Sequence, residues 1–240
     1  MIMVALVVGT VAFDSGARAG PLFQLTDALE SASSTLASRN SGVFFAPALD
    51  GNGAGMSGGG KKLVYDSSFF PSIGTVAFDI RPTKGYYGTI LDTVGTMSAK
   101  PGDFTVHYYS AVNKLFVDMW DTNNQLRRIS TDMSSGVWSR VGFGYSDGGM
   151  QLYVNGQLRA STVGNFSREG YERKVYLGDM DLDYYIKTAL PGFVGFVDNL
   201  QTSDVKNDSR LLNIATVPEP GSLVLAVPAL LGFALRRRRK

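Results

Sequence analysis

The 240-residue sequence contains no cysteine and a single histidine, His107. Without cysteine the chain has no disulfide, no thiolate metal site and no cysteine nucleophile. A lone histidine excludes a zinc site built from several histidines. Glutamate is also scarce, with four copies at Glu30, Glu169, Glu172 and Glu219. The sequence is therefore poor in cysteine, histidine and glutamate, on which many metal-dependent and acid–base enzymes rely.

Charge is scarce as well, because Asp, Glu, Lys and Arg make up only 18% of the chain. The formal net charge is +2, and it falls to −3 when the five positive charges of residues 236–240 are set aside. A nucleic-acid-binding domain needs a basic face. The slightly acidic remainder therefore argues against nucleic acid as a partner.

An apolar run near the N-terminus extends from Val4 to Phe13 and is followed by Ala17-Arg18-Ala19. The run has the length of the apolar region of a signal peptide, and Ala17 and Ala19 are small residues at the positions that signal peptidase requires. We therefore predict that residues 1–19 are a signal peptide cleaved after Ala19, although no Lys or Arg precedes the run. A buried N-terminal strand is the alternative.

The last 24 residues, 217–240, contain Pro218-Glu219-Pro220, then a segment without charge as far as Leu235, then a basic cluster. This cluster consists of Arg236, Arg237, Arg238, Arg239 and Lys240. Residues 221–235 would extend about 22 Å as a helix, which is short of the roughly 30 Å of a bilayer core. The segment therefore predicts a marginal transmembrane helix with its basic end in the cytoplasm. A buried helix with a basic end is the alternative.

This order of features resembles the PEP-CTERM sorting tail. The resemblance implies that an exosortase recognises Pro218, Glu219 and Pro220 and cuts the chain near them. It also implies transient anchoring in the inner membrane of a bacterium, followed by release to the cell surface or extracellular matrix. Exosortase and signal peptidase are the expected processing partners.

Between the two ends, apolar residues alternate with others in short segments at 75–80, 104–109, 114–119, 141–145 and 150–154. A period of two residues predicts strands with one set of side chains on each face of a sheet. Asn155-Gly156 follows the last segment and predicts a type I′ hairpin turn. Short, closely spaced strands and the 28 glycines predict an all-β sandwich.

Three stretches of the sequence resemble the laminin-G-like, concanavalin A-like jelly roll: residues 138–158, Leu49-Asp50-Gly51 and residues 191–200. The resemblance implies a jelly-roll β-sandwich over residues 43–205. A lead-in segment at 20–42 would precede it, and a linker at 206–216 would follow it. A different kind of β-sandwich is the alternative.

In jelly rolls of this family the first and last strands lie side by side, which would bring Asp50 and Asp198 together. The resemblance therefore implies a candidate structural calcium site, because calcium takes oxygen ligands. The alternative is that backbone groups satisfy both carboxylates.

Aromatic side chains beside glycine or aspartate are candidates for stacking on sugar rings, and they are Tyr86, Tyr87, Trp120, Tyr184 and Tyr185. The alternative is that these rings pack in the core or form cross-strand pairs. For His107, which alternates with strand residues, we predict an exposed sheet position rather than a ligand role.

Retaining glycoside hydrolysis needs two carboxyl groups about 5 Å apart. The sequence has no Glu-x-Asp-x-x-Glu pattern, and Glu169 and Glu172 lie in a predicted loop. Asp179, Asp181 and Asp183 indicate cation binding or a solvated loop. We therefore predict no enzymatic activity. The expected function is an exported surface or matrix protein that binds exopolysaccharide. The alternatives are an adhesive protein with protein partners and, less favoured, a secreted glycoside hydrolase.

Overall fold

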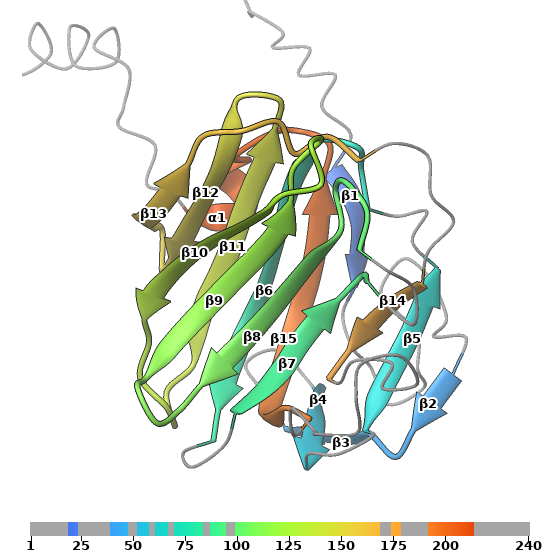
Figure 1. Ribbon diagram of the computed structural model, residues 1–240. Helices are drawn as coiled ribbons and strands as arrows, with labels where there is room; N and C mark the ends of the chain where they lie inside the picture. Colours follow the sequence, from blue (N-terminus) through green and yellow to red (C-terminus); the bar gives the residue numbers. More distant parts are fainter. Residues whose placement is uncertain are drawn as a thin grey trace, which may run out of the picture.

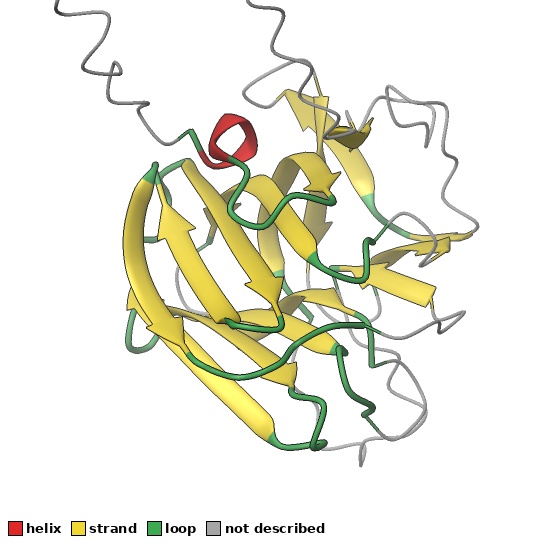
Figure 2. Ribbon diagram, turned by 90° about the horizontal axis from the view of Figure 1, so that it is seen from above, coloured by secondary structure: helices red, strands yellow, loops and turns green. Residues whose placement is uncertain are grey.

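The computed structural model describes residues 19–23, 39–47, 52–57, 61–66, 70–83, 87–94, 99–168, 174–178 and 192–213. Within these ranges the chain forms two antiparallel sheets that pack face to face (Figures 1 and 2). The predicted all-β sandwich is therefore confirmed. No helix among the described residues has the length and apolar character that a membrane crossing requires.

The first sheet has eight strands in the order β13, β12, β11, β6, β15, β4 and β3, and β1 also pairs with β15. Their bounds are β1 Ala19–Phe23, β3 Phe44–Pro47, β4 Asn52–Ser57, β6 Gly74–Pro82, β11 Ser139–Ser146, β12 Gly149–Val154, β13 Gln157–Thr162 and β15 Val194–Ser203.

The second sheet has seven strands in the order β10, β9, β8, β7, β14, β5 and β2. Their bounds are β2 Arg39–Ser41, β5 Lys62–Asp66, β7 Tyr87–Asp92, β8 Phe104–Tyr109, β9 Lys114–Trp120, β10 Leu126–Asp132 and β14 Lys174–Leu177. In Figure 1 its strands β7 to β10 lie in front of β11, β6 and β15 of the first sheet.

The core lies between the two sheets and takes the inward-facing residue of each alternating pair. Phe104 of β8 meets Phe143 of β11 with ring centroids 5.1 Å apart, and both rings are fully buried. Burying such a side chain stabilises the fold by about 1.5–3 kcal/mol. The five alternating segments predicted from the sequence correspond to β6, β8, β9, β11 and β12.

The turn between β12 and β13 is the one that the sequence predicts. Asn155 and Gly156 have φ values of 50° and 77°, and Val154 pairs with Gln157 on either side of them. Two successive positive φ values are the signature of a type I′ turn, whose twist matches that of the flanking strands.

Residues on both sides of the predicted 43–205 domain take part in the sandwich. β1 pairs with β15 and β2 pairs with β5, so the lead-in segment supplies two strands. After β15, helix α1 (Ser209–Leu212) packs Leu212 against Gly142 on the outer face of β11, where a side chain on Gly142 would collide with it. The chain before residue 19 and after residue 213, including Ala17 and the predicted sorting tail, lies outside the described residues.

Candidate functional site

The outer face of the seven-stranded sheet carries aromatic and charged side chains in alternation. Along β9 the residues Leu115, Val117 and Met119 enter the core. Because successive residues of a strand point to opposite faces, the outward set on β9 is Lys114, Phe116, Asp118 and Trp120. The residues opposite this set come from β8 and β10, since both strands pair with β9 along its length.

Four rings form a continuous series across β7, β8 and β9 on this face. Tyr87 lies edge-on to Tyr109 with centroids 5.2 Å apart, and its centroid is 5.4 Å from that of His107. His107 stacks on Phe116 at 5.1 Å with an interplanar angle of 20°. Tyr109 is 41% exposed. The series therefore has an accessible aromatic end.

An ion pair lies beside the rings. Nε and one terminal nitrogen of Arg128 each donate to a carboxylate oxygen of Asp118 at 2.7 Å, and the guanidinium lies 5.2 Å from the Phe116 centroid. The hydrogen bond to Asp118 raises the pKa of Arg128 above its ordinary value. Half of the Arg128 side chain is exposed, whereas Asp118 is buried. The remaining donors of Arg128 can therefore meet a ligand without breaking the pair.

The prediction that His107 is exposed is wrong, because the structure leaves only 4% of the residue accessible. Burial lowers the pKa of His107 to about 4, although the nearby carboxylate of Asp118 acts in the opposite direction. His107 is therefore neutral at neutral pH. The rings of Tyr87 and Phe116 on the two neighbouring strands contact it, and a residue's own strand pattern carries no information about such neighbours.

Two of the predicted sugar-stacking residues, Tyr87 and Trp120, share this outer face. Tyr87 pairs with Tyr109, which pairs with Lys114. Trp120 lies six residues further along β9, or about 20 Å at the rise of a strand. One sugar ring cannot contact both, but a polysaccharide chain running along β9 can. The other predicted stacking residues, Tyr86, Tyr184 and Tyr185, lie outside the described residues.

The turn after Trp120 is built by Asp121. Its carboxylate accepts hydrogen bonds from the backbone N–H groups of Asn123 and Gln125 and from Nε of Arg127. Burial raises the pKa of Asp121, but these hydrogen bonds outweigh it and hold the pKa below the ordinary value. Asp121 therefore fixes the turn that follows Trp120 and has little capacity left for a ligand.

Sequence reasoning missed Tyr109, Phe116 and the Asp118–Arg128 pair. The alternation at 104–109 and 114–119 already places Tyr109 and Phe116 on the face opposite the core residues. No comparable signal was available for Arg128, because β10 has a single core residue, Ile129.

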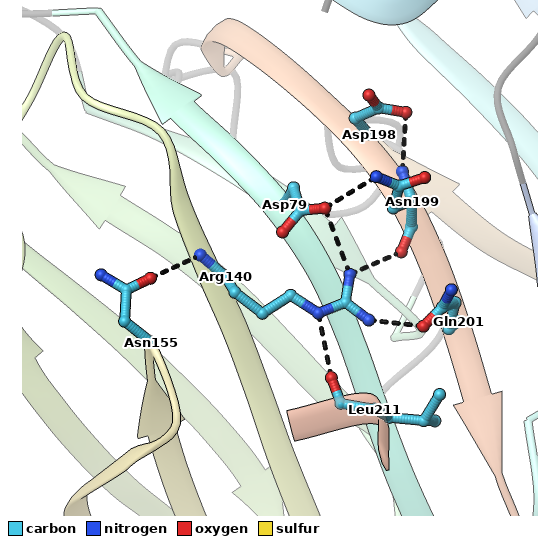
Figure 3. A network of polar contacts seen from close by, with 7 residues as sticks. All are labelled: Asp79, Arg140, Asn155, Asp198, Asn199, Gln201 and Leu211. Carbon is cyan, nitrogen blue, oxygen red and sulfur yellow. Dashed lines mark hydrogen bonds and ion pairs between the residues drawn. The ribbon is translucent and has the colours of Figure 1, made fainter. Parts of the chain in front are cut away.

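Asp198, one of the two predicted calcium ligands, lies fully buried on the other sheet, beside a polar network centred on Arg140 (Figure 3). Its carboxylate accepts the backbone N–H of Asn199 at 2.8 Å. Among the described residues no three His, Asp or Glu side chains converge in a way that could hold a metal ion. Asp50 lies outside them, although the adjoining strand β4 does pair with β15. Of the two predicted ligands, Asp198 alone lies among the described residues, and calcium binding stays a prediction.

Arg140 joins three strands and the helix. Its guanidinium donates to the carbonyl oxygens of Leu211 at 2.9 Å and Asn199 at 3.0 Å, and to the side-chain oxygen of Gln201 at 2.5 Å. It also pairs with Asp79 at 3.4 Å, where both side chains are close to 10% exposed. Burial lowers the pKa of Arg140, and Asp79 opposes that effect. This network has a structural role, because the protein itself occupies its donors.

A laminin G family model, described as the concanavalin A-like lectin/glucanases superfamily, matches residues 55–205 of this chain. The chain belongs to this superfamily. The predicted jelly roll of that type is thereby confirmed. A comparison with curated proteins found no match.

Solved structures with the same fold include receptor-binding domains of botulinum neurotoxins. The domain of a C/D mosaic serotype is 16% identical with a TM-score of 0.62, and 81% of this chain aligns with 50% of that chain. The type G domain is 13% identical with a TM-score of 0.60, over 80% and 49% of the two chains. The serotype D domain in complex with N-acetylneuraminic acid is 15% identical with a TM-score of 0.58, over 81% and 49%. This chain thus aligns with about half of each domain, and at such identities the likeness shows the fold alone.

The superfamily's description includes glucanases as well as lectins. The carboxylates that the sequence analysis weighed for hydrolysis lie outside the described residues: Glu30, Glu169, Glu172, Glu219, Asp179, Asp181 and Asp183. The absence of enzymatic activity therefore stays a prediction.

Proposed function

We propose that this protein is an exported, non-catalytic carbohydrate-binding protein, and that the outer face of its seven-stranded sheet binds polysaccharide. The observation that carries the proposal is the ring series of Tyr87, His107, Tyr109 and Phe116 beside the half-exposed Arg128. Trp120 extends the same face along β9.

This arrangement suits a sugar chain. Aromatic rings offer large apolar faces, which match the C–H faces of pyranose rings. Arg128 supplies hydrogen-bond donors, and Tyr109 and Tyr87 supply hydroxyl groups, for the polar edges of the same sugars. A sheet face of this length suits a polymer better than a single small molecule, because the aromatic groups lie spread along the strands.

The fold relatives support the same class of ligand. One of the related neurotoxin structures is a complex with N-acetylneuraminic acid, a sugar. Together with membership of a superfamily that is described by lectins and glucanases, this favours carbohydrate over other ligands for the present chain.

The proposal is tested by glycan-array binding of the parent chain, Tyr87→Ala and Trp120→Ala. Tyr153→Ala is the matched control, because Tyr153 is a half-buried tyrosine of β12 in the other sheet whose hydroxyl reaches Gln151. Loss of one stacking ring is expected to weaken binding about tenfold or less in the first two variants. Equal binding by all four proteins, or binding by none, would overturn the proposal.

Export rests on the sequence of the two ends. We propose that signal peptidase removes residues 1–19 and that an exosortase cuts near Pro218, Glu219 and Pro220 after transient anchoring in the inner membrane. The intact mass of the protein from each cell fraction tests this. A mature form that lacks residues 1–19 and the tail, in the extracellular fraction, is expected. An intact tail in the membrane fraction would contradict exosortase sorting.

A further inference from the structure

A row of side chains crosses the outer face of the other, eight-stranded sheet. Phe44 of β3 is opposite Gly55 of β4, Gly55 is opposite Phe196 of β15, and Phe196 is opposite Arg81 of β6. These residues face outward, because Val197, which follows Phe196 on β15, belongs to the core.

Trp138 completes the row on the far side of Arg81. It directly precedes Ser139, which pairs with Ile80 of β6, so Trp138 stands next to Arg81. The set of Phe44, Gly55, Phe196, Arg81 and Trp138 is called here the aromatic row. It crosses β3, β4, β15 and β6 and ends at the residue before β11, and four inter-strand spacings amount to about 19 Å.

Neighbouring members of the aromatic row contact one another, and the rings of Trp138 and Phe196 also lie with their centroids 6.4 Å apart. Phe44 lies edge-on to Phe196 with centroids 6.0 Å apart. The Arg81 guanidinium lies 4.6 Å from the Phe196 centroid and 5.4 Å from the Trp138 ring centroid. A side chain on Gly55 would collide with the ring of Phe44, so glycine is what allows that ring to lie over β4. Phe44 is 46% exposed, which leaves the row accessible from solvent.

Arg81 is the unusual member of the row. Within the described ranges the side chain of Arg81 contacts these two rings and makes no hydrogen bond or ion pair. Asp79, two residues earlier on the same strand, is engaged by Arg140 and by the side chain of Asn199. A guanidinium has five donors in a planar fork that matches a carboxylate. Arg81 is thus a cation held in place by ring contacts with its donors free.

We propose that the aromatic row binds an anionic polysaccharide, with a sugar carboxylate paired to Arg81 and adjacent sugar rings stacked on Phe44 and Trp138. Exposed hydroxyl side chains flank the row, since Ser57 follows Gly55 by two residues on β4 and Thr83 follows Arg81 by two residues. They can accept or donate hydrogen bonds to sugar hydroxyls.

The position of the row favours a sugar over a peptide or a membrane. Gly55, Phe196 and Arg81 lie on β4, β15 and β6, which each have a neighbour on both sides, so a peptide strand cannot join the sheet at Arg81. Membrane surfaces are recognised by clusters of basic residues, whereas the row contains a single arginine. A series of rings with one cation fits a polymer that carries carboxylates on its sugars.

This inference does not rest on the proposed site of the seven-stranded sheet, because the two surfaces lie on opposite sheets. Binding to each surface can therefore be lost independently. Trp120→Ala should leave binding at the aromatic row unchanged, and Arg81→Gln should leave binding at the first surface unchanged.

The test uses polygalacturonate and its methyl-esterified form, which has the same sugars with blocked carboxylates. Full chains are compared in a background in which Arg236–Arg239 are replaced by serine, because that cluster would itself attract a polyanion. The variants are Arg81→Gln, Arg81→Lys and Phe44→Ala. Arg159→Gln is the matched control, since it removes one exposed positive charge from β13. Binding is measured by calorimetry, and thermal melting confirms that each variant is folded.

Arg81→Gln is expected to weaken binding of polygalacturonate roughly tenfold or more, because a charged bidentate contact is lost. Arg81→Lys should recover part of the affinity, Phe44→Ala should lose several-fold, and Arg159→Gln should bind as the parent does. Equal binding of the esterified polymer, or no difference between Arg81→Gln and Arg159→Gln, would overturn the proposal. Binding of acidic peptides or anionic vesicles through Arg81, without binding of polygalacturonate, would overturn the assignment to a sugar.

Discussion

On the outer face of the seven-stranded sheet, Arg128 lies over Phe116 and pairs with Asp118. On the outer face of the eight-stranded sheet, Arg81 lies against the rings of Phe196 and Trp138, and no carboxylate of the described chain pairs with it. Both faces therefore carry an arginine beside aromatic rings, but Arg128 alone is paired with a carboxylate of the described chain. We therefore expect neutral sugars at the first face and a ligand that carries negative charge at the second. The comparison teaches that the internal partner of a charged side chain decides whether that charge is left available for a ligand.

The largest effect on stability should follow from replacing Arg140, the buried arginine of the eight-stranded sheet. Arg140→Met removes the partner of Asp79 and the donors that reach β15 and α1. Leaving a buried carboxylate without its cation is expected to cost about 3–5 kcal/mol in the free energy of unfolding. Urea unfolding at neutral pH measures it. Lys114→Met, which breaks an exposed pair with Asp132, should cost less than about 1 kcal/mol, and equal losses would contradict the structural role of Arg140.

A smaller effect on stability is expected from His107 of the seven-stranded sheet, whose contribution depends on pH. The pKa of His107 is lowered to about 4 in the folded chain, whereas an unfolded histidine titrates near 6.5. Between these values the unfolded chain binds more protons, so stability falls as pH decreases from about 6.5 to about 4. His107→Phe keeps a ring between Tyr87 and Phe116 and removes this titration.

The parent should lose roughly 1–3 kcal/mol more than His107→Phe across that window. Chemical unfolding at several pH values measures the difference, and the comparison with the variant subtracts the contribution of carboxylates. Parallel pH profiles for the two proteins would show that His107 is not kept neutral by its surroundings.

The smallest change in stability is expected for Gly55→Ala on the eight-stranded face. The added methyl group displaces the ring of Phe44, but that ring is already half exposed and can turn into solvent. Stability should therefore change by less than about 1 kcal/mol, while affinity for polygalacturonate drops several-fold. Gly148→Ala is the control, because that turn glycine has only two side-chain atoms near the added group, both at 3.8 Å. Unchanged affinity in Gly55→Ala would exclude Phe44 from the binding surface.

The sequence predicted those strands whose alternation has a clear inner set, as in β6 with Val76, Phe78 and Ile80. It missed β10, where polar residues precede and follow Ile129, the one core residue of the strand. It also assigned residues 206–216 to a linker, whereas Asp208 caps α1 and binds the hydroxyl of Ser203. In both cases the stabilising contacts come from other parts of the fold, and a local pattern does not contain them.

The sequence by itself determined the period-two strands, the Asn155-Gly156 turn and the kind of side chains available for a ligand. These depend on backbone preferences and on burial of one strand face, which are local properties. The tertiary structure alone decided which of these side chains meet. Phe196 reaches Arg81 because β15 pairs with β6, and Arg128 reaches Asp118 because β10 pairs with β9. Strand order and register set the partner of each charge, because they bring together residues whose separation along the chain carries no signal.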